Sequence, residues 1–135
     1  MKVVLDTNVL VSALLSPFGP PARVLDLALS GDVTLAYDDR IMAEYRAVLT
    51  RPRFGFNQED VAALLAFVRD EGQATVAANW PRSMPDDDDV AFVEVAASAE
   101  ATLITGNTRH FPPDVANPVA VMTPAEFMAL RQWVQ

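Results

Sequence analysis

The sequence contains no cysteine, which excludes disulfide bonds and metal sites built from thiolates. It has one lysine, Lys2, and one histidine, His110, so enzymes that need a lysine late in the chain or a pair of catalytic histidines are excluded as well. No apolar run reaches the roughly 18–20 residues of a membrane-spanning helix. These absences favour a cytoplasmic protein with no membrane association.

Positive charge is also scarce. The 135 residues include 10 Lys and Arg against 18 Asp and Glu, which gives a net charge of −8. This balance argues against a protein that grips nucleic acid mainly through a basic surface. Either the partner is not a nucleic acid, or the acidic residues are concentrated where a divalent cation offsets their charge. The length fits one domain that spans residues 1–135.

Short apolar segments alternate with amphipathic ones along the chain. We expect strands at 2–5, 33–37, 102–105 and 119–122, with a further candidate at 74–78. We expect helices at 7–15, 22–31, 38–51, 58–72, 90–101 and 123–134, and loops at 16–21 and 106–114. Such alternation predicts an α/β domain with a mostly parallel central sheet. In open sheets of this kind, ligands bind outside the carboxyl ends of the strands.

Three polar residues fall at that edge of the predicted sheet. Asp6 follows the first strand directly, and Asn107 follows the 102–105 strand by two residues. Glu44 lies near the apolar stripe of the helix that begins after the second strand. Each has an ordinary alternative: a turn or cap for Asp6, a turn for Asn107, and for Glu44 a solvated side chain paired with Arg40 or Arg51.

Four consecutive aspartates at 86–89 stand directly before an apolar helix. A helix start needs one cap and gains only about 0.3–1 kcal/mol from an acid in its first turn, so four acids exceed that need. Asp89 falls on the buried stripe of the helix, because Phe92 follows it at i+3. We expect Asp86 and Asp87 to face water as cap and first turn, while Asp88 stays a candidate. No glycine follows at calcium-loop spacing, which excludes an EF-hand.

Like charges set a condition on any cluster of these acids. If Asp6, Glu44 and Asp89 lie within about 5 Å of one another, each pair repels by roughly 3 kcal/mol at an effective dielectric constant near 20. Protonation of one acid or a bound divalent cation would relieve that repulsion. Oxygen ligands without cysteine favour Mg²⁺ or Mn²⁺ over Zn²⁺.

Taken together, these segments resemble PIN-domain proteins, and most closely the group similar to VapC toxins of toxin–antitoxin pairs. The segments that carry the resemblance are LDTNVLVSALL, AEYRAVLTRPRF, DDVAFVEVAASAEATLITGNTRHF and VMTPAEF, which extend through nearly the whole chain. The resemblance implies a three-layer α/β/α sandwich with a mostly parallel sheet. It makes Asp6, Glu44 and Asp89 the first three acids of the family motif.

The fourth motif position departs from the family pattern. It is most often aspartate in the family, and here it is Asn107, which offers a carbonyl oxygen but no charge toward a second metal. Thr105 matches the hydroxyl residue that usually precedes this position. The resemblance implies a catalytic set of Asp6, Glu44, Asp89 and Asn107, with supporting roles for Asn8, Asp88 and Thr105.

The function implied by the resemblance is cleavage of RNA phosphodiesters with Mg²⁺ or Mn²⁺ held by the three acids. The implied partners are the RNA substrate, a small antitoxin protein and a second copy of the chain in a homodimer. Arginines that could hold the RNA backbone are Arg46, Arg51, Arg53, Arg82 and Arg109. Phe54 and His110 could stack on bases, and packing is the alternative for His110.

Other enzyme classes fit the residues less well. A haloacid-dehalogenase-type phosphatase needs a second aspartate two residues after the first, where this chain has Asn8, and both it and a response-regulator receiver need a late lysine. The glycine patterns of dinucleotide-binding and P-loop proteins are absent. Two alternatives stay open: a catalytically weakened PIN module that binds RNA or a protein partner, and a housekeeping RNA-processing nuclease.

Overall fold

The computed structural model describes residues 1–133 and contains a five-stranded sheet with the strand order β3-β2-β1-β4-β5. The central strand β1 (Lys2–Leu5) pairs with β2 (Thr34–Tyr37) on one side and with β4 (Thr102–Ile104) on the other. The two edges are the short strands β3 (Gln73–Ala74) and β5 (Val121–Met122). All four pairings are parallel, which confirms the predicted α/β class.

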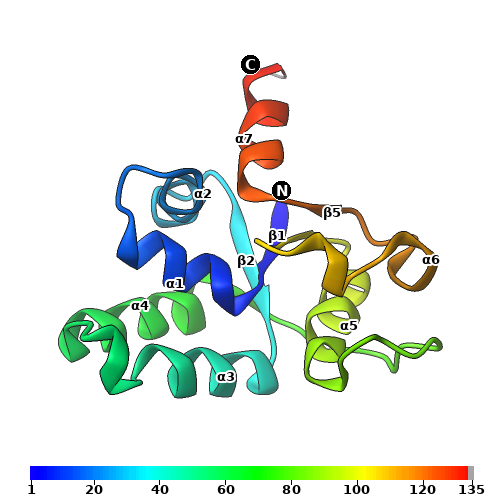
Figure 1. Cartoon of the computed structure of the whole chain (residues 1–135), viewed down its shortest axis with the longest axis horizontal. Coiled ribbons are helices and arrows are strands. Elements are labelled where there is room, and N and C mark those ends of the chain that lie inside the picture. The colour runs from blue at the N-terminus through cyan, green and yellow to red at the C-terminus, as the bar shows by residue number, and fades with distance from the viewer. Residues whose placement is uncertain (134–135) are drawn as a thin grey trace.

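Helices cover both faces of the sheet. They are α1 (Thr7–Leu15), α2 (Pro20–Leu29), α3 (Asp39–Leu49), α4 (Gln58–Glu71), α5 (Val90–Ala99), α6 (Pro113–Ala116) and α7 (Pro124–Trp133). Short 3₁₀ turns lie at Pro52–Phe54, Asp87–Asp89 and Thr108–His110. Figure 1 shows α1, α2 and α4 on one side of the central strands and α5 on the other, so the predicted layers are present.

Side-chain caps begin several of the helices where the sequence predicts them. The Asp38 carboxylate accepts a hydrogen bond from the Ile41 N–H (3.0 Å) at the start of α3. Asn57 caps α4 in the same way. At the start of α7, the Thr123 hydroxyl accepts from the Glu126 N–H (3.1 Å) and the Glu126 carboxylate accepts from the Thr123 N–H (2.9 Å), which is the predicted capping box. The expected end of this helix at residue 134 lies outside the described residues.

Several expected boundaries were wrong, among them the following. Helix α2 begins at Pro20, two residues earlier than expected, because proline is well suited to the first turn, where its missing N–H would have no helical partner. The expected strand at 74–78 pairs with β2 only at Gln73–Ala74, and Val76 beyond it is 98% exposed. The expected loop at 106–114 contains the 3₁₀ turn Thr108–His110 and the first residues of α6.

The core runs along the central strands and helix α5. Val3, Val4 and Leu5 are at most 1% exposed, and α5 is buried on nearly every side because the loop at 75–86 covers the face that the sheet does not. After β3 the chain passes through α5 to β4 on the other side of β1, so the strand order reverses between β1 and β4. At such a switch point the carboxyl ends of neighbouring strands leave a crevice. None of the helices in residues 1–133 is long and apolar enough to cross a membrane.

Candidate functional site

Asp6 lies at the carboxyl end of β1, at the switch point of the sheet. Its N–H donates to the Ile104 carbonyl (2.9 Å), so the β1–β4 pairing holds the residue in place. The residue is 6% exposed, and the fully buried Thr105 hydroxyl donates to Asp6 Oδ2 (2.8 Å). Burial raises the pKa of Asp6, and the hydrogen bond from Thr105 opposes that rise.

Glu44 reaches the same region from helix α3. The Thr7 hydroxyl at the start of α1 donates to Glu44 Oε2, which joins the first helix to the third. Partial burial raises the pKa of Glu44, and the charges of Asp6 and Asp88 raise it further. Arg51 at the end of the helix lowers it, as an opposite charge must.

Asp89 is the third acid, at the junction between the 3₁₀ turn 87–89 and α5. Its side chain is only 13% exposed, and its Oδ2 atom is buried with no hydrogen-bond partner among the described residues. Burial raises the pKa of Asp89 to about 6; the negative charge of Asp6 adds to this rise, and His110 opposes it. The other three aspartates of the run are exposed. As expected, Asp86 is a cap, because it accepts from the Asp88 N–H (2.9 Å).

The loop after β4 is tied to the turn after β1 by polar side chains. The Gly106 N–H donates to Asn8 Oδ1 (3.1 Å), and the Asn107 N–H donates to Thr105 Oγ1 (3.0 Å). The Asn107 side chain is used within the loop: its Oδ1 accepts from the Arg109 N–H (3.2 Å), and its Nδ2 lies 3.1 Å from His110 Nε2. The fourth motif position therefore acts locally as a turn cap.

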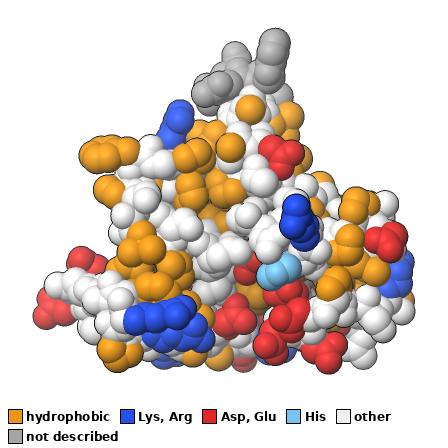
Figure 2. All heavy atoms as spheres, in the orientation of Figure 1, with side chains coloured by type: hydrophobic (Ala, Val, Ile, Leu, Met, Phe, Trp, Pro, Cys, Tyr) orange, Lys and Arg blue, Asp and Glu red, His pale blue; other side chains and the backbone are white. Residues whose placement is uncertain are grey.

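Asp6, Glu44 and Asp89 come from three distant parts of the chain and share one electrostatic environment. Asp6 raises the pKa of both other acids, and Glu44 also raises that of Asp89. Figure 2 shows acidic side chains gathered around the single histidine on this face, with a group of Lys and Arg side chains to one side. The sequence placed Asp6 and Glu44 at one sheet edge, and in the structure the three acids lie near enough for the charge of Asp6 to act on both of the others.

The predicted RNA-contacting arginines have different surroundings. Arg51 lies near enough to Glu44 to lower its pKa, and the Arg53 guanidinium lies 4.8 Å from the centre of the Phe54 ring. Arg46 lines a cavity between α3 and α4, and Arg109 is exposed in the turn after β4. Arg82 is held instead by the Val115 and Asn117 carbonyl groups and by the Trp80 ring, and so it anchors a loop.

Sequence reasoning missed Glu94, which is 6% exposed within α5. Its Oε1 accepts from Arg40 Nη1 (2.7 Å) and its Oε2 accepts from the Trp80 N–H (2.6 Å). Arg40 also pairs with Asp38 at 2.7 Å, so its ion pairs go to Asp38 and Glu94 rather than to Glu44, the alternative partner considered from the sequence. The sequence did offer a sign of this role: Glu94 is the one acid within a helix that is apolar on nearly all sides, and a buried acid needs a partner.

The donor set of the acidic cluster suits a hard divalent cation. Carboxylate oxygens are the ligands that Mg²⁺ and Mn²⁺ prefer, and Asp89 Oδ2 is a buried acceptor that lacks a donor among the described residues. As they stand, the side chains of residues 1–133 contain no group of three or more His, Cys, Asp or Glu close enough to hold an ion. Binding therefore requires the three carboxylates to converge, which a cation would favour by offsetting their repulsion.

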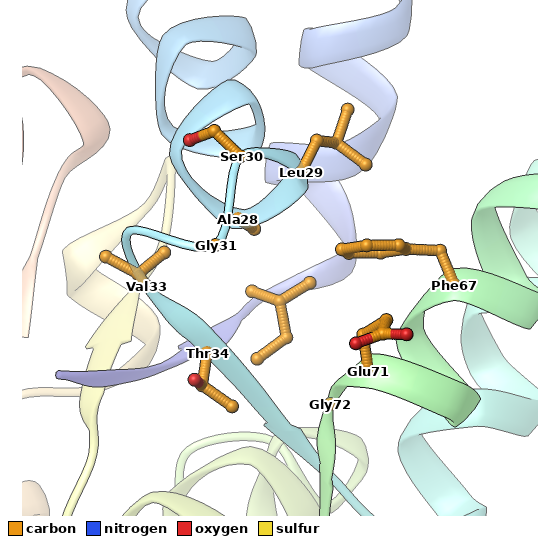
Figure 3. A pocket seen from close by; sticks show the side chains of 10 residues that line it. Ala28, Leu29, Ser30, Gly31, Val33, Thr34, Phe67, Glu71 and Gly72 are labelled. Atoms are coloured by element: carbon orange, nitrogen blue, oxygen red, sulfur yellow. The ribbon is translucent and has the colours of Figure 1, made fainter.

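A separate cavity of about 460 Å³ is lined by none of these acids (Figure 3). It is bounded by the end of α2, the beginning of β2 and the end of α4, with Leu29, Phe67 and Glu71 among its lining residues. Because it opens at the amino end of β2, it lies away from the carboxyl edge where the acidic cluster sits. It takes no part in chemistry at the cluster.

The fold and this cluster define a class of protein: a parallel α/β sheet with buried carboxylates at its switch point. A family model described as PIN domain matches residues 2–109. The chain therefore belongs to the PIN domain family.

Individual proteins are also similar to this chain in sequence or in fold. The uncharacterized protein MJ1680 of Methanocaldococcus jannaschii is 29% identical over 110 residues, which cover 79% of this chain and 71% of that protein. The solved structure of VapBC-1 from nontypeable Haemophilus influenzae is similar with a TM-score of 0.61 at 18% identity, covering 93% of this chain and 99% of that chain. FitAcB from Neisseria gonorrhoeae gives a TM-score of 0.58 at 20% identity, with 91% and 98% covered. At these identities the structural likeness establishes the fold.

Proposed function

We propose that this chain is an endoribonuclease that depends on Mg²⁺ or Mn²⁺ and is the toxin of a toxin–antitoxin pair. One observation carries the proposal: Asp6, Glu44 and Asp89 all have pKa values raised mainly by burial, and the charge of Asp6 raises the pKa of the other two acids further. Clustered carboxylates of this kind are stabilised by a divalent cation. Membership of the PIN domain family, which is generally metal-dependent, supports the same chemistry.

The residues of the cluster have separate tasks in the proposed reaction. A bound divalent cation would supply an activated water and offset negative charge on the phosphate. Asp6, Glu44 and Asp89 would hold it, while Thr105 and Thr7 orient two of these carboxylates by hydroxyl donation. Asn107 and Asn8 fix the two loops that frame the cluster, and Asp88 adds negative charge at its rim.

The RNA would lie across the α3–α4 connection and the turn after β4. Arg51, Arg53 and Arg109 are exposed there, and we assign them, with Arg46, to the phosphate backbone. Phe54 stacks on Phe56 with ring centres 5.3 Å apart, which gives a planar surface for an unpaired base. His110, half-exposed beside the acids, is a further contact for the RNA.

The proposed protein partners are a small antitoxin and a second copy of the chain, in the cytoplasm. Solved structures similar to this fold include VapBC2 from Rickettsia felis bound to a DNA fragment from its promoter (TM-score 0.58, 15% identity, 91% of this chain and 98% of that chain covered). The chain also exposes apolar side chains that a partner could cover: Phe18 is 94% exposed and Leu15 is 57% exposed.

A cleavage assay on structured and unstructured RNA, with and without Mn²⁺, tests the enzyme proposal. We expect cleavage that requires the metal and that Asp6→Asn or Asp89→Asn abolishes while the variant stays folded. RNA or antitoxin binding without any cleavage would favour the second candidate, a PIN module that only binds, which the uncharged Asn107 supports. A chain without a neighbouring antitoxin gene, but with metal-dependent cleavage, would be a housekeeping RNA-processing nuclease.

A further inference from the structure

His110 is the only histidine in the chain, and it stands between the fourth motif position and the third acid. Its Nε2 lies 3.1 Å from Asn107 Nδ2, and its Nδ1 lies 3.5 Å from Asp89 Oδ2. That carboxylate oxygen is the one that is buried without a hydrogen-bond partner among residues 1–133. The imidazole ring therefore links the residue that departs from the family pattern to an acid of the cluster.

The orientation of the Asn107 amide follows from its other contact. Its carbonyl oxygen accepts from the Arg109 N–H (3.2 Å), which leaves the amide nitrogen facing the ring. An amide nitrogen only donates, so His110 Nε2 must accept and carries no proton. The proton of the neutral imidazole is then on Nδ1, the nitrogen that faces Asp89.

We propose that Asn107 and His110 form a positioning pair that replaces the fourth carboxylate of this site: Asn107 fixes the tautomer, and His110 Nδ1–H steadies Asp89. The inference rests on the proposed metal-dependent function. A site with three carboxylates and one imidazole carries less negative charge than a site with four carboxylates. It therefore holds a single divalent cation.

Aspartate at position 107 would not serve this arrangement. A carboxylate cannot donate to Nε2, so the substitution would remove the donor that holds the ring in one tautomer. The ring would then stand between two carboxylates, and both of its nitrogens would face an acceptor. Asparagine at position 107 thus suits the histidine three residues later, because its amide nitrogen can donate to the ring.

The tautomer can be read directly, since one histidine gives one set of imidazole signals. Long-range ¹H–¹⁵N spectra of the metal-free protein, at a pH where the ring is neutral, should show the proton on Nδ1. Asn107→Asp should lose this single Nδ1–H tautomer, whereas the exposed control Asn117→Asp, on another loop, should keep it. A proton on Nε2 in the unmodified chain, or the same spectrum for Asn107→Asp, would overturn the proposal.

Calorimetric titration with Mn²⁺ tests the metal consequence independently of cleavage. We expect one ion per chain, a second ion in Asn107→Asp, and affinity roughly tenfold lower or worse in His110→Phe, with partial recovery in His110→Gln because its amide can donate to Asp89. Two ions in the unmodified chain, or unchanged Mn²⁺ affinity in His110→Phe, would refute the proposed role of Asn107 and His110. Metal-dependent cleavage together with the Nε2 tautomer would remove this inference and leave the proposed function standing. The Nδ1 tautomer without metal binding or cleavage would keep the tautomer assignment but overturn both the single-cation part of this inference and the proposed function.

Discussion

At the scale of single residues, Asp89 links burial to the pH dependence of stability. Its pKa is about 6 in the folded protein and about 3.9 in an unfolded chain, so the folded state binds the proton more tightly. The favourable contribution is fully present below about pH 4 and is lost as the pH rises through about 6. Asp6 and Glu44 shift in the same direction for the same main reason, burial.

Asp89→Asn should therefore stabilise the metal-free protein at about pH 7.5 by about 1 kcal/mol, after allowance for solvent screening, or about 4 °C in melting temperature. The Asp89 side chain makes no capping hydrogen bond at the start of α5, so the substitution by asparagine removes no such bond. Thermal unfolding in EDTA at about pH 4.5 and 7.5 measures this. The exposed Asp87→Asn is the control, and equal melting shifts for both variants would contradict the assignment.

Thr105→Val should test the support of Asp6. Valine has nearly the same shape but removes the hydroxyl that donates to Asp6 Oδ2 and accepts from the Asn107 N–H. Because both partners are left with unmet hydrogen bonds in a buried place, we expect a loss of about 1–3 kcal/mol in the free energy of unfolding. Urea denaturation gives the value, and Thr105→Ser should lose far less. A neutral Thr105→Val would mean that water replaces the hydroxyl.

At the scale of elements, the alternation of apolar and amphipathic segments predicts the strands and helices that bury side chains. This pattern does not predict features that depend on tertiary contacts. Strand β3 is cut to two residues because the chain leaves the sheet edge to cover α5, and no local pattern records that path. The covering loop is held by Glu94, whose partner Arg40 is 54 positions away, so its role is visible only when the fold is known.

Glu94→Gln should loosen the attachment of this loop to α5 and α3. Glutamine can still accept from the Trp80 N–H but loses the ion pair with Arg40, whose side chain is 49% exposed. We expect a loss of about 2 kcal/mol, below that of a fully buried pair, because water can reach the arginine. Chemical denaturation measures the loss, and faster limited proteolysis within residues 75–86 should accompany it. Lower stability with an unchanged cleavage pattern would place the effect elsewhere.

At the scale of the whole molecule, the strand order brings Asp6 and Thr105 together at the switch point, and this much of the site follows from the sequence. Short strands ending in polar residues predict one functional edge. The exact approach of Glu44 and Asp89 depends on how α3 and α5 pack across the sheet, which no spacing rule fixes. The Asn107–His110 contact likewise depends on the 3₁₀ turn at 108–110, which was expected to be an irregular loop.

Under the proposed function, Mn²⁺ should stabilise the whole fold, since a cation held by the folded chain alone would offset the repulsion among the acids. At about one hundred times the dissociation constant, the gain is about 2.7 kcal/mol, or about 10 °C for a domain of this size. Differential scanning calorimetry with a series of Mn²⁺ concentrations measures it. Asp6→Asn should show little rise, and an equal rise in that variant would mean that the ion binds elsewhere.

The hydrogen bond from Thr105 to Asp6 joins residues 99 positions apart. A ribosome adds about 5–20 residues per second, so about 5–20 s pass between the synthesis of the two groups. During that interval the first acid has neither its hydroxyl donor nor the β4 strand beside it. A growing chain therefore cannot complete the surroundings of Asp6 until residue 105 has emerged and folded, and a message cut short before that point would yield a chain without them. If the proposed nuclease activity holds, the order of the strands delays it until translation has passed β4.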